Sequence, residues 1–268
     1  MLQKIKVVCI LSLVSIMAAA CLSKPSIFTG NAPAKGSFFN SMPERDGLVF
    51  IGVSGKMSNP KDTLQFALED AARQIAVFHR VSGEYMTINN VGSGAFDYTH
   101  NTYTSLQYDE AGAYQYVDSL QYDADVDTLE IENAFFVRTT YTSALSSPVR
   151  FRPKYSGDNK KPDWVDDPPF EIDGYEVGVG FAGRHSSLAT TYRNSFNNAV
   201  FAIIRSVNTA SHSSDLLYQT TTSLFGYKTS NDNTIYSYGT LTGFYVLDTW
   251  VDPREKTVWT LAIAKKSQ

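Results

Sequence analysis

The chain has 268 residues, and its 23 Lys and Arg against 27 Asp and Glu give a formal net charge of −4 at pH 7. This balance argues against nucleic acid and anionic lipid surfaces as partners, because both require clustered Lys and Arg. Aromatic residues are abundant, with 16 Tyr and 16 Phe, which is typical of pleated sheets with aromatic cross-strand pairs.

Residues 1–20 have the three regions of a secretory signal peptide. Lys4 and Lys6 precede an apolar run, and from Val7 to Ala20 there are 14 residues without a charge. A helix needs roughly 20 apolar residues to span a bilayer, so we expect this segment to be cleaved rather than retained. Because Lys4 and Lys6 leave with the signal, the mature chain has a net charge of −6.

Three alanines, Ala18 to Ala20, stand directly before Cys21. This arrangement resembles the lipobox of bacterial lipoproteins, in which the cysteine sulfur receives a diacylglycerol and becomes the new amino terminus. The resemblance implies a membrane anchor at Cys21, with the body in the periplasm or at the cell surface. The outer membrane is favoured over the inner one, since Leu22 and not Asp follows the cysteine. An ordinary signal peptide with an A-x-A cleavage site is the alternative.

The mature chain is expected to contain no disulfide and no free thiol, because Cys9 leaves with the signal and Cys21 carries the lipid. A tether rich in Ser, Pro, Gly and Asn is predicted over residues 21–43, and a first folded domain over residues 44–155. In that domain, an apolar run ending at Gly55 predicts a strand.

A helix follows this strand, with Asp62 as its predicted N-cap. Its apolar residues recur at the i, i+3, i+4 spacing of an amphipathic helix. After a Tyr-rich stretch from Met86 to Asp127, to which no elements are assigned, residues 135–141 predict another strand. A polar linker over residues 156–162 ends the domain.

The same pattern returns about 127 residues later, in a second domain predicted over residues 162–268. A glycine-bounded strand over 173–180 precedes a helix over 187–207, and a terminal β-hairpin lies within 240–264. The apolar stripes of the two helices match one for one, as Leu64, Ala67, Leu68, Ala71, Ala72 and Ile75 against Tyr192, Ser195, Phe196, Ala199, Val200 and Ile203. We interpret this as an internal duplication of an α+β unit with one long helix on a small antiparallel sheet.

The order of elements resembles the Lpp-twenty family of bacterial lipoproteins, and more distantly the flagellar-assembly lipoproteins. The matching segments are Pro162 to Trp164, Asp173 to Gly180, the alanine-bearing helix, Val246 to Asp252 and Val258 to Ala262. The resemblance covers most of residues 162–265 and, in degraded form, residues 46–141. It implies two tandem domains with a dodecin-like βαββ fold, in a cell-envelope lipoprotein with no assigned catalysis.

Two glycine motifs partly match the signatures of phosphate-binding loops and of a nucleophile elbow. Gly178 to Gly183 satisfies G-x-G-x-x-G, but no acid follows between Glu176 and Asp215 to hold a ribose. Gly52 to Met57 lacks both the spacer and the hydroxyl of a phosphate loop, and Ser54 misses the nucleophile elbow by one position. Glycines that end a strand close to its helix explain both motifs better.

No metal site and no cofactor are predicted. Asp123 to Asp127 lacks the glycine and the closing glutamate of a calcium loop, and Asp166 and Asp167 are interpreted as solvated. Trp250 and Trp259 are predicted to face each other across the terminal hairpin, as packing residues rather than as a ligand platform. The histidines lie in four separate segments without zinc-ligand spacing, at His79, His100, His185 and His212.

These observations predict a non-catalytic envelope lipoprotein that presents its duplicated domains for protein or envelope contacts. No catalytic residue is predicted. The chain is expected to contact the membrane through the lipid on Cys21. Its other partner is expected to be an unidentified protein, and no nucleic acid partner is predicted. Two alternatives stay open. One is a carrier of lipid or a small ligand with an apolar cavity, and the other is an envelope hydrolase whose acids converge only in three dimensions.

Overall fold

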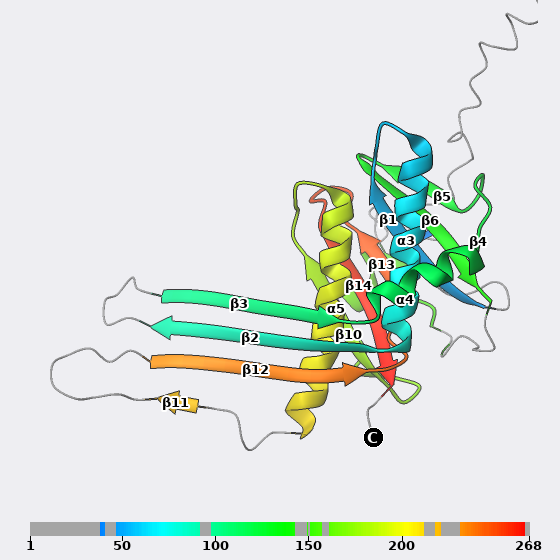
Figure 1. Ribbon diagram of the computed structural model, residues 1–268. Coiled ribbons are helices and arrows are strands. Elements are labelled where there is room, and N and C mark those ends of the chain that lie inside the picture. Colours follow the sequence, from blue (N-terminus) through cyan, green and yellow to red (C-terminus); the bar gives the residue numbers. More distant parts are fainter. Residues whose placement is uncertain are drawn as a thin grey trace, which may run out of the picture.

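The computed structural model describes residues 38–40, 47–91, 98–142, 149, 151–156, 161–211, 218–220 and 231–265. Within these residues the fold is mixed α+β and every strand pair is antiparallel (Figure 1). The expected fold class is therefore confirmed at this level. The described part contains three α-helices, α3 (Pro60–His79), α4 (Glu110–Ala113) and α5 (Leu188–Ser211).

The first half of the chain forms a sheet with one long helix across it. Its strands run in the order β1-β6-β4, with β5 beside β6, and α3 packs on β1 and β6. A short 3-10 helix, η1, also packs on α3. These elements are β1 (Leu48–Gly55), η1 (Tyr114–Ser119), β4 (Leu120–Gln121), β5 (Thr128–Ile131) and β6 (Ala134–Tyr141).

The second half forms a sheet in the order β13-β14-β10-β9, and α5 packs on β10 and β14. A small hairpin of β7 and β8, followed by the 3-10 helix η2, leads into it at the predicted linker. These elements are β7 (Tyr155–Ser156), β8 (Lys161–Pro162), η2 (Asp163–Val165), β9 (Glu171–Ile172), β10 (Tyr175–Ala182), β13 (Tyr245–Val251) and β14 (Val258–Lys265).

A glycine in β1 and another in β10 let each long helix approach its sheet at backbone distance. A Cβ on Gly52 would lie 1.9 Å from the carbonyl oxygen of Ala67, and a Cβ on Gly180 would lie 2.0 Å from that of Ser195. Ala67 and Ser195 occupy the same place in the two predicted helix stripes. The strand and the helix therefore meet in the same way in both halves.

The helix stripes are confirmed as core positions, since all twelve residues except the half-buried Leu64 are buried. The prediction of Asp62 as the N-cap of the first helix is wrong. The helix begins at Pro60, and its N-cap is Asn59, whose side chain accepts a hydrogen bond from the Lys61 amide at 3.1 Å. Proline suits the first helical position, so the asparagine directly before it is the better cap than Asp62.

The terminal strands differ from the expected hairpin in one place. The first strand of the predicted hairpin would run from Thr240 to Val251, but this stretch belongs to two strands separated by a turn at Gly243, whose φ is +66°. The first of them is β12 (Asn231–Leu241), which leaves the body of the molecule. A left-handed residue favours glycine, so Gly243 marks the point where the chain changes direction.

The two halves are joined by strand pairing and by a shared core. Strand β12 of the second half pairs with β2 (Val81–Val91) of the first half along its full length. The rings of Phe50 and Tyr245, one from each half, lie 5.7 Å apart at right angles in one hydrophobic cluster. The two halves of the chain are therefore in extensive contact, through backbone pairing and through packed side chains.

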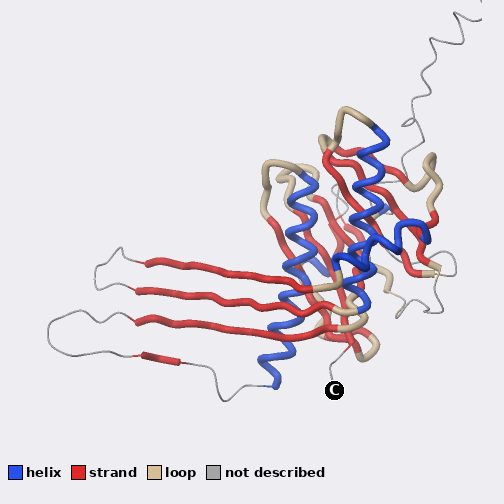
Figure 2. Tube along the Cα trace, viewed as in Figure 1, coloured by secondary structure: helices blue, strands red, loops and turns tan. Residues whose placement is uncertain are grey.

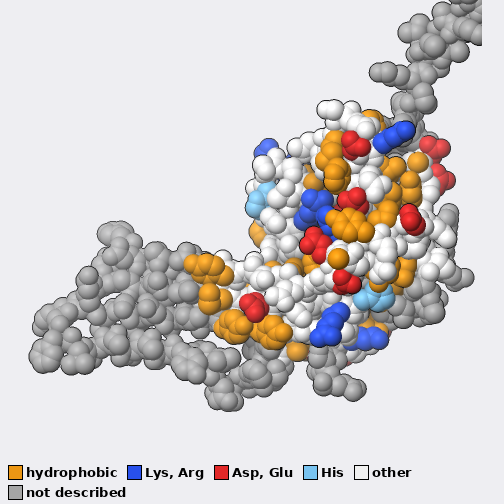
Figure 3. All heavy atoms as spheres, viewed as in Figure 1, with side chains coloured by type: hydrophobic (Ala, Val, Ile, Leu, Met, Phe, Trp, Pro, Cys, Tyr) orange, Lys and Arg blue, Asp and Glu red, His pale blue; other side chains and the backbone are white. Residues whose placement is uncertain are grey.

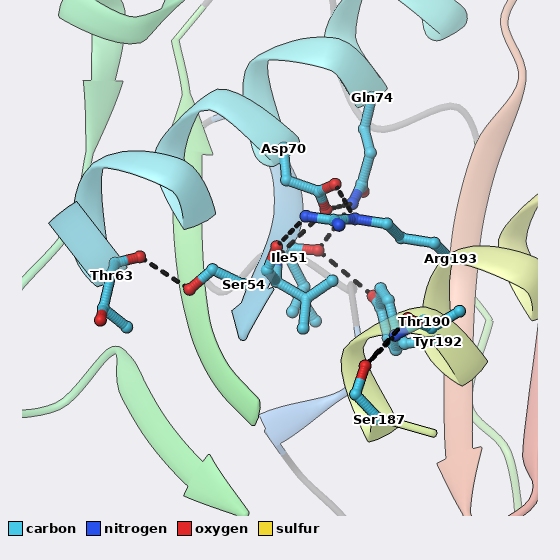
Figure 4. A network of polar contacts seen from close by, with 10 residues as sticks. Ile51, Ser54, Thr63, Asp70, Gln74, Ser187, Thr190, Tyr192 and Arg193 are labelled. Carbon is cyan, nitrogen blue, oxygen red and sulfur yellow. Dashed lines mark hydrogen bonds and ion pairs between the residues drawn. The ribbon is translucent and has the colours of Figure 1, made fainter. Parts of the chain in front are cut away.

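The outer edge of β1 is closed by polar side chains from both long helices (Figure 4). The Val53 amide donates to the carboxylate of Asp70 at 3.0 Å, and the carbonyl of Val53 accepts from Arg193 at 2.7 Å. Arg193 also pairs with Asp70 at 2.7 Å, and Gln74 donates to the Ile51 carbonyl at 2.7 Å. Because an edge strand has unpaired backbone groups, these contacts both satisfy β1 and connect α3 to α5.

We expect a thermodynamic coupling between Asp70 and Arg193. The carboxylate is 8 % exposed but the guanidinium side chain is 42 % exposed, so solvent screens part of the attraction. A double-mutant cycle with Asp70→Asn and Arg193→Met, measured by urea unfolding, should give a coupling free energy of about 1–2 kcal/mol. The surface pair Lys161 and Asp166 is the control and should give less than about 0.5 kcal/mol. Equal couplings in the two cycles would contradict the structural role of the network.

Candidate interaction surface

One sheet projects beyond the rest of the molecule, and we name it the arm. Its strands lie in the order β11-β12-β2-β3, where β3 is Tyr98–Gln107 and β11 is Tyr218–Thr220. Figures 1 and 2 show β2, β3 and β12 running side by side away from the two long helices. Strands β2 and β12 have 11 residues each, so at roughly 3.3 Å per residue the arm is about 35 Å long.

The base of the arm packs on α5 through one of its two faces. The Tyr85 ring lies 6.1 Å from the ring of Phe201 and 4.6 Å from the guanidinium carbon of Arg205. A Cβ on Gly83 would lie 2.5 Å from the terminal methyl of Ile204, so a larger residue at this strand position would displace that side chain. These contacts hold the base of the arm against the helix.

The opposite face of the arm presents tyrosines to solvent, because side chains alternate along a strand. Tyr103, Tyr236 and Tyr238 are 56 %, 43 % and 51 % exposed. Met86 of β2 lies directly between Tyr103 and Tyr236 in the strand register. We name these four residues the tyrosine face. Figure 3 shows hydrophobic side chains, a class that includes Tyr and Met in that view, over the described part of the arm.

The tyrosine face has the chemistry of a protein contact surface. Tyrosine offers a large apolar ring with a polar hydroxyl and only two side-chain torsions to order, which is why it is enriched at protein interfaces. Among the residues of this face whose side chains the structure describes, Glu84 is the one with a charge, between Tyr238 and Ser105 in the register, and Asp232 shares the face further along β12. The face therefore suits aromatic packing and hydrogen bonding more than attraction of a charged partner.

The glycine motifs serve packing in the structure. Gly178 and Gly180 lie inside β10, and a Cβ on Gly178 would lie 2.5 Å from the Ile203 side chain and 2.7 Å from the Ala199 carbonyl oxygen. Backbone and side chains of α5 thus fill the space over both glycines. The Ser54 hydroxyl donates to the Thr63 carbonyl at 2.7 Å and is 1 % exposed, which agrees with its interpretation as an ordinary strand-end serine.

Within the described residues, no three His, Cys, Asp or Glu side chains lie close enough to share a metal ion. The His79 ring stacks on Tyr116 at 5.6 Å, and a His185 ring nitrogen lies 2.9 Å from the Asn194 amide. Only the backbone of His100 is described, and His212 lies outside the described residues.

The acidic loop at residues 123–127 binds its own backbone. The Asp123 carboxylate accepts from the Asp125 amide at 3.0 Å, and the Asp127 carboxylate accepts from the Asp123 amide at 2.9 Å. The carboxylates of Asp123 and Asp127 are thus bound within a local turn. Asp166 forms an ion pair with Lys161 at the surface.

The tryptophans of the terminal hairpin face each other as predicted, since Trp250 and Trp259 are directly opposed in the register. Trp250 is 9 % exposed and belongs to the main hydrophobic cluster. The Trp259 ring lies 4.5 Å from the Phe181 ring. Both indoles therefore take part in packing.

A buried carboxyl group at Asp248 is a feature that sequence reasoning missed. Asp248 is 0 % exposed and accepts hydrogen bonds from the Trp164 indole at 2.8 Å and from the Tyr155 hydroxyl at 3.1 Å. Burial raises the pKa of Asp248 to about 7, although these bonds and one from the Thr249 amide act to lower it. This carboxyl group fixes β13 to the segment between the two halves and is closed to solvent.

Four cavities that are lined by described residues have volumes of about 330, 410, 370 and 140 Å³. Their acidic lining residues are Asp109, Glu132 and Asp70, in three different cavities, so none of the four contains a pair of carboxylates. The largest is lined mainly by polar side chains such as Asn194, Asn197 and Asn198. These cavities add no observation in favour of the hydrolase or the carrier alternative.

Comparisons with protein-family models, with curated proteins and with solved structures give no match for this chain. None of the helices in the described ranges combines the length and apolar character that a membrane crossing requires. Cys21, the predicted lipid acceptor, precedes the described residues.

Proposed function

We propose that this chain is a non-catalytic, lipid-anchored protein of the bacterial cell envelope that contacts protein partners through its arm. The observation that carries this proposal is the tyrosine face, with three tyrosines between 43 % and 56 % exposed on a sheet that leaves the body. These side chains add little to the core, because their rings remain in solvent. Exposed aromatic patches on a rigid support are typical of interaction sites.

The anchor is supported by the sequence around Cys21 and by the way the chain enters the body. Phe38 and Phe39 are 1 % and 3 % exposed, and the Phe39 ring packs edge-on against Phe136 at 5.1 Å. With Cys21 as the first mature residue, 17 residues separate the lipid from Phe38. At a maximum of roughly 3.5 Å per residue, the body would stay within about 60 Å of the membrane surface.

We further propose that the two halves descend from one dodecin-like unit, as the resemblance to the Lpp-twenty family implies. The support is the matched glycine contact, Gly52 on Ala67 and Gly180 on Ser195, together with the shared order of strand, helix and antiparallel strands. Chance matching of one contact is plausible. Matching of the contact, the helix stripe and the element order together favours duplication.

The lipid anchor is tested by Cys21→Ser, which removes the acceptor sulfur and leaves hydrophobicity nearly unchanged. Wild-type protein should incorporate labelled palmitate and stay with membranes through high-salt washing, since two or three acyl chains bind far more firmly than one. The Cys21→Ser variant should lose the label and either stay unprocessed or become soluble. A wild-type chain without label, or one whose mature form begins elsewhere, would overturn the anchor.

The role of the arm is tested by replacing Tyr103, Tyr236 and Tyr238 together with serine in the full-length chain. Exposed substitutions change stability little, so the melting temperature should stay within a few degrees of wild type. Native electrophoresis of solubilised envelopes should show wild type in larger complexes and the variant shifted to the size of the single chain. The control replaces Tyr122 and Phe170, which are 38 % and 89 % exposed away from the arm, and should behave as wild type. An unshifted triple variant would contradict the proposal.

A further inference from the structure

Strand β3 forms the outer edge of the arm. It pairs with β2 without a register shift from Gln107 to Tyr98, and no described strand pairs with its other side. Edge strands are normally protected from further pairing by charged residues, proline, bulges or short length. Strand β3 is ten residues long and contains no Asp, Glu, Lys, Arg or Pro. It therefore carries none of these protections.

The same protein closes its β1 edge in a different way. Backbone groups of Ile51 and Val53 are bound by the side chains of Gln74, Asp70 and Arg193. Hydrogen bonds of this kind occupy the positions that an added strand would need. Strand β3, in contrast, is the last described strand on its side of the sheet.

We propose that β3 pairs with β3 of a second copy of this chain, antiparallel and about a two-fold axis at Tyr103. This inference rests on the proposed function, because it names the partner that the arm contacts. Directly opposed residues of an antiparallel pair share one face of the sheet. The two-fold axis must therefore lie midway between two copies of the same residue, so that this residue is directly opposed to itself. Tyr103 is near the middle of β3 and 56 % exposed, and on this axis it meets Tyr103 of the second copy.

Charge favours a second copy as the occupant. A two-fold contact at Tyr103 places residues that are equally far from Tyr103 on its two sides opposite each other, so an edge with charges of one sign would repel itself. Strand β3 has no acidic, Lys or Arg residue, and Tyr103 pairs well with another aromatic ring. Copies anchored by lipid to one membrane would also meet at a raised local concentration. In the paired form the tyrosine faces of the two arms make one continuous surface.

A charge-exchange experiment tests this inference on full-length protein purified from membranes with two different affinity tags. Wild-type chains should co-purify, and Tyr103→Lys or Tyr103→Glu alone should lower co-purification about tenfold, through like-charge repulsion and loss of the ring pair. A mixture of the Lys and Glu variants should recover it. Unchanged circular dichroism would show that each variant is folded. Wild-type chains that fail to co-purify, or single variants that co-purify as wild type, would overturn self-pairing.

A cysteine variant tests the register. Tyr103→Cys should form a disulfide-linked dimer on mild oxidation, because the two Cα atoms would be about 5 Å apart. The control is Tyr238→Cys, on the same face and 51 % exposed but on β12, which should remain monomeric. Equal dimer from both positions would refute the β3 edge. If the arm instead cross-links to a different protein, self-pairing is wrong while the proposed function stands. If the arm contacts no protein, both self-pairing and the proposed function are wrong.

Discussion

Gly52→Ala and Gly180→Ala should each lower the free energy of unfolding by about 3 kcal/mol or more, as measured by urea denaturation. The added methyl carbon would lie 1.9 Å or 2.0 Å from a carbonyl oxygen of the facing helix, far inside contact distance. The obstructing atoms belong to helix backbone, so relief requires the whole helix to move away from its sheet. Rotation of a side chain cannot relieve this repulsion, because the atoms in conflict belong to a closely packed backbone.

Each half provides its own control three residues further along. A Cβ on Gly55 or on Gly183 would meet no atom within 4 Å, and neither residue has a positive φ. Alanine at these positions should leave stability unchanged or raise it by up to about 1 kcal/mol, by restricting the unfolded chain. If Gly52→Ala is no more harmful than Gly55→Ala, the close strand-helix approach is wrong.

Asp248→Asn should change how stability depends on pH. Burial raises the pKa of Asp248 from the ordinary value near 3.8 to about 7, so the folded state keeps a proton that the unfolded state releases between these values. The wild type therefore gains stability from this group as pH falls through 7, by about 1.4 kcal/mol per pH unit. The variant has no proton to lose at this position.

The comparison is made by measuring urea unfolding of both proteins from pH 8 to pH 5.5. The stability of wild type minus that of Asp248→Asn should increase by about 2 kcal/mol over this range, with the change beginning near pH 7. Subtraction removes the contributions of the other groups, which both proteins share. A difference that stays constant, or that grows toward high pH, would show that the buried carboxyl group does not behave as its surroundings imply.

The spacing of apolar residues along the sequence was sufficient to predict the helices and strands that bury a regular row of apolar side chains. The strand ending at Gly55, both long helices and the strand over residues 135–141 were predicted because each has a clear apolar repeat. The tight contact at Gly52 and Gly180 follows from the same pattern, since small residues face each other across strand and helix.

The arm was missed because its pairing is distant in sequence and its composition is mixed. Glu84 of β2 lies opposite Tyr238 of β12, more than 150 residues away, and no local pattern reports such a partner. Polar and aromatic residues occupy both faces of β3, so the alternation that identifies a half-buried strand is weak. The stretch from Met86 to Asp127 was therefore left without assigned elements.

The cluster at Asp248 had a signal that was overlooked. An aspartate within the apolar run from Val246 to Trp250 is unusual, and a buried acid requires hydrogen-bond donors. Its donors, Trp164 and Tyr155, lie 84 and 93 residues away. Only the three-dimensional structure identifies them, although the aspartate alone marks the strand as one that needs polar partners.

Photo-cross-linking from Tyr238 tests most directly whether the arm is a contact surface. A photoreactive amino acid replaces Tyr238 in the full-length chain, and intact cells are irradiated before the envelope proteins are separated. We expect a covalent product with a protein, and no such product when the same amino acid replaces Tyr122, which is 38 % exposed but lies away from the arm. Absence of a product at Tyr238, or equal products from both positions, would contradict the role of the arm.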